Sequence, residues 1–243
     1  MPMNGTHDTG YRFLFSEPRM VRDLLRGFLR EEWIGWLDLD TLVRRESRQR
    51  EPPQHALEET LVWRLRWQGG STWVYFLLNF QATEDPAMAL RVGLDRELLH
   101  QDLLRYHTAA WLPVAIPVVL YGGEAPWQAA REALDLFLPL PPALQRYAPR
   151  TRYLLLDVTH DPIPATAGAD NLVSLLCELE RSRTPEAVDA LLERLVGFVS
   201  GPGDEALRQA WSTFLGRYFL PRRFPDLFTP GMAEALGSGG VLA

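Results

Sequence analysis

The stretch that decides the fold of this chain is WVYFLLNFQATED, residues 73–85. An unbroken apolar run ends at Leu78 and is followed by Asn79, Phe80 and Gln81, and then by a polar turn. A strand that is apolar on both faces is typical of the centre of a sheet. Because side chains alternate along a strand, the two amides lie on one face, about 7 Å apart. Two amides at the end of a buried strand therefore mark a candidate site.

The residues before this strand predict its antiparallel neighbour. TLVWRLRW, residues 60–67, alternates one set of side chains with another, which indicates a strand with two distinct faces. The first set is Leu61, Trp63, Leu65 and Trp67, and the second is Thr60, Val62, Arg64 and Arg66. QGGS, residues 68–71, predicts a hairpin turn. Thr60 then opens the first strand where Asn79 and Gln81 end the second, so the three polar side chains are expected to converge.

Helical and strand patterns divide the rest of the chain. The spacing of apolar residues predicts helices over 17–30, 85–107, 170–182, 184–200 and 203–220, and strands over 112–123 and 152–158. The Arg-rich, Pro-containing residues 37–54 predict a loop or an edge segment. We therefore expect an α/β core over 7–160, an all-α C-terminal region over 168–222, and disorder at 1–6 and 233–243.

Composition narrows the classes of protein that the chain can represent. A length of 243 residues is ample for a buried core. The single cysteine, Cys177, excludes a disulfide within the chain and suits a reducing compartment, and its helical spacing indicates a core residue rather than a nucleophile. The N-terminus has no apolar segment of a signal peptide, and no apolar run approaches about 18 residues. The expected location is the cytoplasm, with no membrane partner.

The charge pattern is unusual in one respect. The formal net charge is −6, and all 25 basic residues are Arg, so any mechanism that needs a catalytic Lys is excluded. An acidic chain is not an obvious nucleic-acid binder. Two clusters could still contact DNA, although a solvated surface is the simpler interpretation of both, and the residues that would bind DNA remain unknown. The clusters are Arg44, Arg45, Arg48 and Arg50, and then Arg222 and Arg223.

Four blocks, taken in order and spacing, resemble one known family. They are HDTGYRFLFS (7–16), TLVWRLRW (60–67), VYFLLNFQATED (74–85) and LPVAIPVVLYGGEAPW (112–127). Together they are similar to the recombination-promoting nuclease (Rpn) family, also called YhgA-like putative transposases, within the PD-(D/E)XK nuclease superfamily. The resemblance covers roughly residues 7 to 220. It implies an αβββαβ-type core with a mixed sheet flanked by helices, Mg²⁺-dependent endonuclease chemistry, double-stranded DNA as the partner, and a role in DNA recombination.

The family pattern can be carried over one position at a time. Its strand usually ends in an acidic residue, one apolar residue and then Gln; Gln81 matches the Gln that orients the attacking water, and Asn79 stands where a metal-binding Glu is usual. The preceding strand usually opens with an Asp, and Thr60 stands in that place. The resemblance therefore implies a retained Gln81 and the loss of both metal carboxylates. No metal cofactor is expected, and Mg²⁺ is expected only if the protein is active.

Three hypotheses about function stay open at this point. The leading one is a degenerate Rpn-like protein whose endonuclease activity is lost or weakened. The second is an active Mg²⁺-dependent endonuclease that uses Glu58, which has the strand parity of Thr60 but must reach back about 7 Å to form a weak metal site; Glu59 points to the opposite face. The third is a non-catalytic partner or inhibitor of another protein, and a homodimer is also open. Without the family pattern, Asn79 and Gln81 would be read only as a polar strand end.

Two residue pairs that contain histidine, His7 with Asp8 and His100 with His107, are weaker candidates. His7 and Asp8 are adjacent, which suits a helix entry or cap better than joint catalysis. His100 and His107 stand seven residues apart on one face of a predicted helix, without an acidic or Cys ligand at metal spacing. We therefore expect both histidines of that helix to lie in the core or on the surface rather than to bind a metal.

Overall fold

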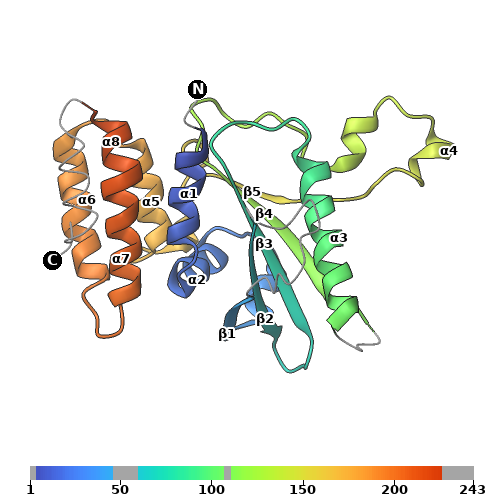
Figure 1. Ribbon diagram of the computed structural model, residues 1–243, viewed down its shortest axis with the longest axis horizontal. Coiled ribbons are helices and arrows are strands. Elements are labelled where there is room, and N and C mark those ends of the chain that lie inside the picture. The colour runs from blue at the N-terminus through green and yellow to red at the C-terminus, as the bar shows by residue number, and fades with distance from the viewer. Residues whose placement is uncertain (1–3, 46–59, 107–110, 226–243) are drawn as a thin grey trace. The chain divides into compact units, whose positions relative to one another are not determined.

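The computed structural model describes residues 4–45, 60–106 and 111–225 (Figure 1). The chain divides into two units: one runs from Gly35 to Asp157 and contains the sheet, and the other combines the chain up to Ile34 with the chain from Val158 onward. The N-terminal helices thus group with the C-terminal helices. This division differs from the boundaries 7–160 and 168–222 expected from the sequence, which stay a prediction.

The sheet unit is built on five strands in the spatial order β1-β2-β3-β4-β5. Their bounds are β1 Leu37–Arg45, β2 Leu61–Trp67, β3 Trp73–Gln81, β4 Val114–Tyr121 and β5 Leu154–Asp157. β2 is antiparallel to both of its neighbours, β1 and β3, whereas β3, β4 and β5 are parallel. β3 is therefore the central strand, as its apolar run predicted, and every residue in it after Trp73 is buried. This mixed sheet with flanking helices is an α/β, nuclease-like fold.

Residues 37–54 were expected to form a loop or an edge segment, and their first part forms the edge strand β1. Its pairing with β2 shifts register between Asp38 and Val43, so the strand is bulged. Thr41 closes the bulge because its Oγ1 accepts a bond from the backbone N–H of Arg66 at 2.8 Å and donates to the carbonyl oxygen of Asp38 at 2.6 Å. A bulged edge strand is a poor template for pairing with another chain. Residues 46–59, including part of the expected Arg cluster, lie outside the described residues.

Helix α3, Met88–Tyr106, lies along one face of the sheet (Figure 1). Its N-terminal part packs Val92 into a cluster with β4 residues, and its C-terminal part packs Leu99 and Leu103 against β2 and β3 residues. Asp85 precedes the helix and accepts a bond from the N–H of Ala87 at 2.9 Å, as expected of a residue at the helix start. The helix therefore covers residues of β2, β3 and β4 on one face of the sheet.

A long connection joins β4 to β5. It contains η2, Ala133–Phe137, and α4, Pro142–Gln145, and its first residues pack on Tyr121. A Cβ at Gly123 would lie 2.0 Å from the Tyr121 hydroxyl oxygen, so only glycine fits at that position. Trp127 stacks edge-on against both Tyr121 and Tyr153 and donates its Nε1–H to the Tyr153 hydroxyl at 2.9 Å. The Gly-Gly stop after β4 thus has a packing cause.

The helical unit begins with a helix that the sequence did not predict as such. Its elements are α1 Asn4–Leu14, α2 Pro18–Gly27, η1 Glu32–Trp36 at the boundary, η3 Ala165–Ala167, α5 Leu172–Arg181, α6 Pro185–Phe198, α7 Glu205–Thr213, the π-helix η4 Phe214–Phe219 and α8 Leu220–Arg223. α1 starts inside the segment 1–6 that was expected to be disordered, and His7 and Asp8 lie within it. The tail 233–243 lies outside the described residues.

Helix starts in this unit follow their capping residues. Asn171 accepts bonds from the N–H groups of Val173 at 2.9 Å and Ser174 at 3.0 Å, and so opens α5. Thr184 accepts from the N–H of Ala187 at 3.3 Å and opens α6, as the TPEA pattern predicted. No helix among the described residues is both long and apolar enough to cross a membrane.

The side chain of Glu180 on α5 is buried and joins three elements of the helical unit. Tyr11 on α1 donates its hydroxyl to Oε1 at 3.1 Å, and Arg222 on α8 donates to Oε2 at 2.5 Å. Arg223 donates to the carbonyl oxygen of Glu180 and lies 3.6 Å from its Oε2. Arg222 and Arg223 therefore bind an internal carboxylate; the side chain of Arg222 is still 39% exposed and that of Arg223 13%, so the expectation of a solvated pair fails only for Arg223.

Cys177, also on α5, is fully buried. Burial raises the pKa of its thiol to about 12, which keeps it protonated at neutral pH. The prediction of a core residue rather than a nucleophile is confirmed.

Candidate functional site

The candidate site lies where β2 begins and β3 ends. Leu61 pairs with Leu78, which places the preceding Thr60 opposite Asn79. The Oγ1 atom of Thr60 lies 3.0 Å from Oδ1 of Asn79, and the residues are only 6% and 3% exposed. The two side chains meet as the hairpin pattern predicted. Their meaning as substituted motif positions stays a prediction.

Gln81 follows Asn79 at the strand end, two residues on and on the same face of the sheet. Its register partner on β4 is Tyr121, and its carbonyl oxygen accepts the N–H of Gly122 at 3.1 Å. The residue is 9% exposed, so it lies at the border between the core and the surface. The assignment of Gln81 as the residue that orients water stays a prediction.

A carboxylate that the sequence reading missed lies at the same place. The Oδ2 atom of Asp95, on α3, is 2.8 Å from Oγ1 of Thr60. Asp95 stands three residues after Val92 and four before Leu99, both fully buried, so it belongs to the stripe of α3 that faces the sheet. An acidic residue inside an apolar helical stripe was the signal that could have identified it.

The side chains of Thr60, Asn79 and Asp95 share few hydrogen-bond donors. The Thr60 hydroxyl has one proton, whereas both Oδ2 of Asp95 and Oδ1 of Asn79 accept bonds from it. The Nδ2 atom of Asn79 is buried without a hydrogen-bond partner in the described part of the chain. A half-turn of the amide lets Nδ2 donate to the Thr60 hydroxyl while that hydroxyl donates to Asp95, which satisfies all three contacts. The amide oxygen then takes over the unpartnered position.

The C-terminal ends of β4 and β5 lie beside the end of β3. Asp157 ends β5 in register with Tyr121, and it is 3% exposed. Its Oδ2 accepts the backbone N–H of Trp127 at 3.3 Å, so this carboxylate holds the connection that follows β4. Burial raises the pKa of the Tyr121 hydroxyl, and the nearby charge of Asp157 adds to that effect. Asp157 therefore supports the aromatic cluster beside the site.

The side chains at the site are poor ligands for a divalent metal. Within residues 4–45, 60–106 and 111–225, no three His, Cys, Asp or Glu side chains gather closely enough to hold a metal ion. Asp95, on α3, supplies one carboxylate, whereas the motif positions Thr60 and Asn79 supply only neutral oxygens. A hard cation such as Mg²⁺ needs negatively charged oxygen ligands in addition to water. The prediction that no metal is bound is not tested by this geometry, but the donor set fits Mg²⁺ badly.

Other residues named from the sequence fall elsewhere. Glu58 and His107 lie outside the described residues, so neither the rescue of the metal site by Glu58 nor the placement of His107 is decided. His100 lies on α3 with its Nε2 atom 3.1 Å from the carbonyl oxygen of Pro113. This contact links α3 to the chain just before β4, and it assigns His100 a structural role.

The cost of opening the Thr60 contacts can be measured directly. Thr60→Val keeps the shape of the side chain but removes the hydroxyl between Asn79 and Asp95. We expect the free energy of unfolding to fall by about 1–3 kcal/mol because a buried amide loses its partner. Thr72→Val, at an exposed hairpin position, is the matched control and should stay within about 0.5 kcal/mol of the parent in urea denaturation. Equal midpoints for both variants would contradict the network.

Comparison with known proteins places the chain beside a group of nuclease-related proteins. A family model described as "Putative transposase, YhgA-like" matches residues 5–199. Recombination-promoting nuclease RpnD of Escherichia coli O157:H7 is 24% identical over 157 residues, which is 64% of this chain and 60% of that protein. In Escherichia coli strain K12, the inactive recombination-promoting nuclease-like protein RpnE is 26% identical over 167 residues, and recombination-promoting nuclease RpnA is 25% identical over 167 residues.

These matches cover 64% of this chain but only part of the relatives in strain K12, namely 52% of RpnE and 53% of RpnA. The chain thus spans between half and three-fifths of the length of the curated relatives described here. No solved structure matches the chain.

Proposed function

The chain belongs to the YhgA-like putative transposase family, and from that premise we propose that it is a nuclease-fold protein whose Mg²⁺-dependent endonuclease activity is lost or severely weakened. The element order supports a core of the PD-(D/E)XK type: three antiparallel strands, then helix α3, then two strands parallel to β3. We infer that the start of β2 and the end of β3 correspond to the positions at which such a core carries its acidic groups.

One observation carries the proposal: the hydrogen bond between Thr60 and Asn79. Their side chains face each other at 3.0 Å in a buried site, and both are neutral. A phosphodiester-cleaving metal site stabilises the negative charge that develops on the phosphate, and it needs carboxylates to retain the cation. Here the amide of Asn79 donates to the Thr60 hydroxyl, and the same hydroxyl donates to Asp95. The two motif positions still face each other, but they lack the carboxylates that would bind a metal.

The names of the relatives support both parts of the proposal, the nuclease fold and the loss of activity. RpnD and RpnA are named as recombination-promoting nucleases, which favours nucleic acid as the ancestral substrate. RpnE is named as an inactive nuclease-like protein, so loss of activity has a parallel among similar proteins. A role connected with DNA recombination is the function that agrees with both.

The experiment is a cleavage assay with supercoiled plasmid DNA in Mg²⁺, with an active relative such as RpnA as the positive control. We expect the rate for this protein to be at least about 100-fold below the control, because an effective metal contributes several kcal/mol and each 1.36 kcal/mol is tenfold in rate. Adding EDTA should abolish cleavage by the control; a small residual rate of this protein that also falls in EDTA would indicate weakened metal chemistry, and one that does not would indicate its loss.

Two further variants separate the remaining outcomes if cleavage is found. Loss of the rate in Glu58→Gln would assign activity to the alternative site proposed from the sequence, and loss in Asp95→Asn would assign it to the α3 carboxylate. A rate within about threefold of the control that needs Mg²⁺ would refute the proposal of a broken site, since about 0.6 kcal/mol is too small for the loss of two ligands.

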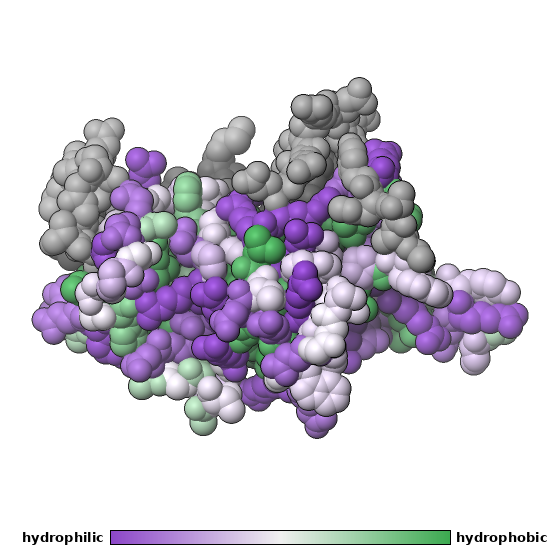
Figure 2. All heavy atoms as spheres, turned by 90° about the horizontal axis from the view of Figure 1, so that it is seen from below, coloured by the Kyte–Doolittle hydropathy of each residue, from purple (hydrophilic) through white to green (hydrophobic). Residues whose placement is uncertain are grey.

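A second candidate, a protein-interaction role, is favoured by the connection between β4 and β5. It carries exposed large apolar side chains in a short span around η2 and α4, and Figure 1 shows α4 at the far end of a projecting segment. They are Leu136, Phe137, Leu138, Leu144 and Tyr147. On the face drawn in Figure 2, by comparison, hydrophilic side chains predominate and hydrophobic residues form separate small groups. Inhibition of RpnA when this protein is added to the cleavage assay would favour the second candidate.

A further inference from the structure

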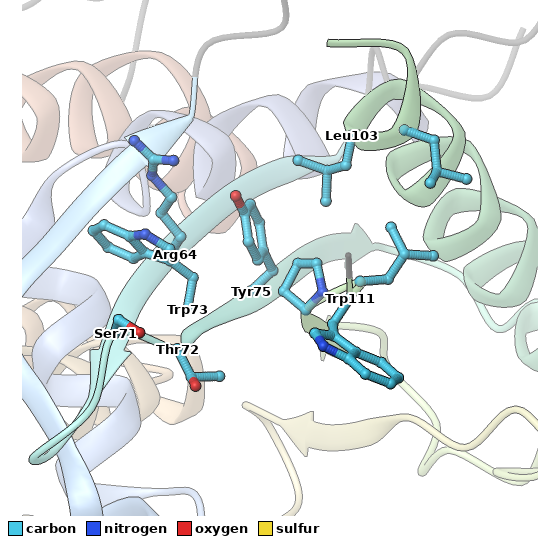
Figure 3. A pocket seen from close by; sticks show the side chains of 10 residues that line it. Arg64, Ser71, Thr72, Trp73, Tyr75, Leu103 and Trp111 are labelled. Carbon is cyan, nitrogen blue, oxygen red and sulfur yellow. The ribbon is translucent and has the colours of Figure 1, made fainter. Parts of the chain in front are cut away.

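A pocket lies on the same sheet face as the candidate site but near the other end of β2 and β3. Its cavity is about 370 Å³, and ten residues line it (Figure 3). The polar ones used below are Arg64 and the hairpin hydroxyls of Ser71 and Thr72. Four residues separate Arg64 from Thr60 along β2, or about 13 Å at strand rise. Val62, Leu77 and Leu99 belong to a core cluster between the two places. The pocket is therefore separate from the candidate site at the start of β2 and the end of β3, which is called the motif edge below.

Arg64 lines this pocket and Arg66 lies beside it on the pocket residue Trp73, and neither guanidinium group has a charged partner among the described residues. Arg64 lies 4.5 Å from the ring centroid of Trp73, and Arg66 lies 4.9 Å from it. Among the described residues no carboxylate pairs with either guanidinium, and the Nε atom of Arg64 is buried without a hydrogen-bond partner. A buried donor on a cation that has no acceptor is costly. An anion that enters the pocket would remove that cost.

The local sequence is free of competing negative charge. No Asp or Glu occurs between Thr60 and Thr83, although the whole chain is acidic, and none occurs in the pocket lining. Asp102, which precedes the pocket residue Leu103 on α3, is paired with Arg45, so that carboxylate is already bound. The pocket therefore attracts anions in a protein whose net charge would repel them.

Aromatic and apolar surfaces form the rest of the pocket. Figure 3 shows Tyr75 between Trp73 and Trp111, with Leu103 beside it. Tyr75 is buried at 3% exposure, whereas Trp111 is 87% exposed and offers both sides of its indole to a ligand. Stacking on such rings favours planar aromatic groups irrespective of their edge pattern. A cavity of this size is at the lower end of the range for small-molecule sites and cannot admit a duplex.

We propose that this pocket binds an unpaired nucleotide of a single-stranded nucleic acid, with the base stacked on Trp111 and the phosphate bound by Arg64 and Arg66. An aromatic platform next to paired Arg side chains is the combination that single-strand binders use. Ser71 and Thr72 supply hydroxyls that suit further contacts with the sugar or phosphate. The inference is independent of whether the motif edge cleaves DNA.

The test measures the binding of a fluorescein-labelled oligo(dT) single strand to the full chain by fluorescence anisotropy, without Mg²⁺. Trp111→Ala is expected to weaken binding about fivefold or more, since one base stacked on an aromatic ring contributes that much. Arg64→Gln should weaken it about tenfold and should reduce the slope of log K against log salt by about 0.7. Trp36→Ala and Arg152→Gln, which change exposed residues away from the pocket lining, should stay within twofold of the parent, about 0.4 kcal/mol.

Competitors identify the part of the ligand that is recognised. Thymidine monophosphate should compete, thymidine without phosphate should compete less, and a duplex of the same length should bind equally well to parent and Trp111→Ala. Parental affinity of both pocket variants for oligo(dT) would overturn the proposal, as would thymidine competing as well as its phosphate. If Arg64→Gln disturbs the hairpin, Trp111→Ala still tests the proposal, because removing an exposed indole should not affect folding. None of these readouts involves cleavage, so failure here leaves the function proposed for the motif edge untouched.

Discussion

Thr60→Asp combined with Asn79→Glu is expected to raise Mg²⁺-dependent cleavage of plasmid DNA at least about tenfold above the parent. The two new carboxylates would face each other where the neutral side chains now meet at 3.0 Å, and Asp95 lies next to them. A hard cation binds where negatively charged oxygen ligands gather, and a bound cation stabilises the charge on the scissile phosphate. The measurement is the initial nicking rate in Mg²⁺ and in EDTA.

A matched control isolates charge from shape. Thr60→Asn with Asn79→Gln introduces side chains of the same size without charge, and this pair should cleave no faster than the parent. Carboxylates crowded against Asp95 also repel one another without metal. The melting temperature of the acidic double variant should therefore rise when Mg²⁺ is added, whereas that of the control should not. A rise in cleavage for both double variants would show that charge is not what the site lacks.

Gln81 gives the same experiment a second readout. In the acidic background, Gln81→Ala should lower the cleavage rate about tenfold or more, because a positioned polar group contributes that much to proton transfer and water orientation. In the parent, the same change should alter DNA affinity by less than about threefold. Equal small effects in both backgrounds would reduce Gln81 to a polar group at a strand end.

The largest effect on stability is expected at the other unit. Glu180→Ala should lower the free energy of unfolding by about 3–5 kcal/mol, since removing one partner leaves the opposite charges of a buried pair uncompensated. Glu180 is 2% exposed, and its carboxylate joins Tyr11, Arg222 and Arg223. Burial lowers the pKa of Arg223 while Glu180 opposes that shift, so this guanidinium depends on its partner. Urea denaturation followed by helical circular dichroism measures the change.

The control for Glu180 lies on the same helix. Glu178 binds Arg194 near the surface, where an ion pair contributes only about 0–1 kcal/mol, so Glu178→Ala should change stability by no more than that. Tyr11→Phe removes one hydrogen bond to Glu180 and should lie between the two, at about 1 kcal/mol. If Glu180→Ala cost no more than Glu178→Ala, the carboxylate would not be holding the helices together.

Local pattern sufficed for the hairpin and for most elements. The apolar run up to Leu78 placed β3 at the centre of the sheet, and strand alternation brought Thr60 opposite Asn79, because both depend on a period of two that every strand obeys. Capping at Thr184 likewise follows from residues three positions apart. Helix α1 was missed because its apolar positions are few and it is stabilised by packing against the C-terminal helices rather than by its own pattern.

Contacts between distant segments were beyond the reach of the sequence. Asp95 reaches Thr60 across 35 residues, and Glu180 binds Arg222 across 42. Each of these charged residues has a pattern of its own that fits an ordinary helix, and nothing in that pattern names its partner. The partner is chosen only when α3 packs on the sheet and α8 packs on α5, because burial then makes an unpaired charge costly. The sequence alone determined that the neutral side chains of Thr60 and Asn79 meet at the end of the hairpin. Only the tertiary structure determined that the carboxylate of Asp95 lies beside them.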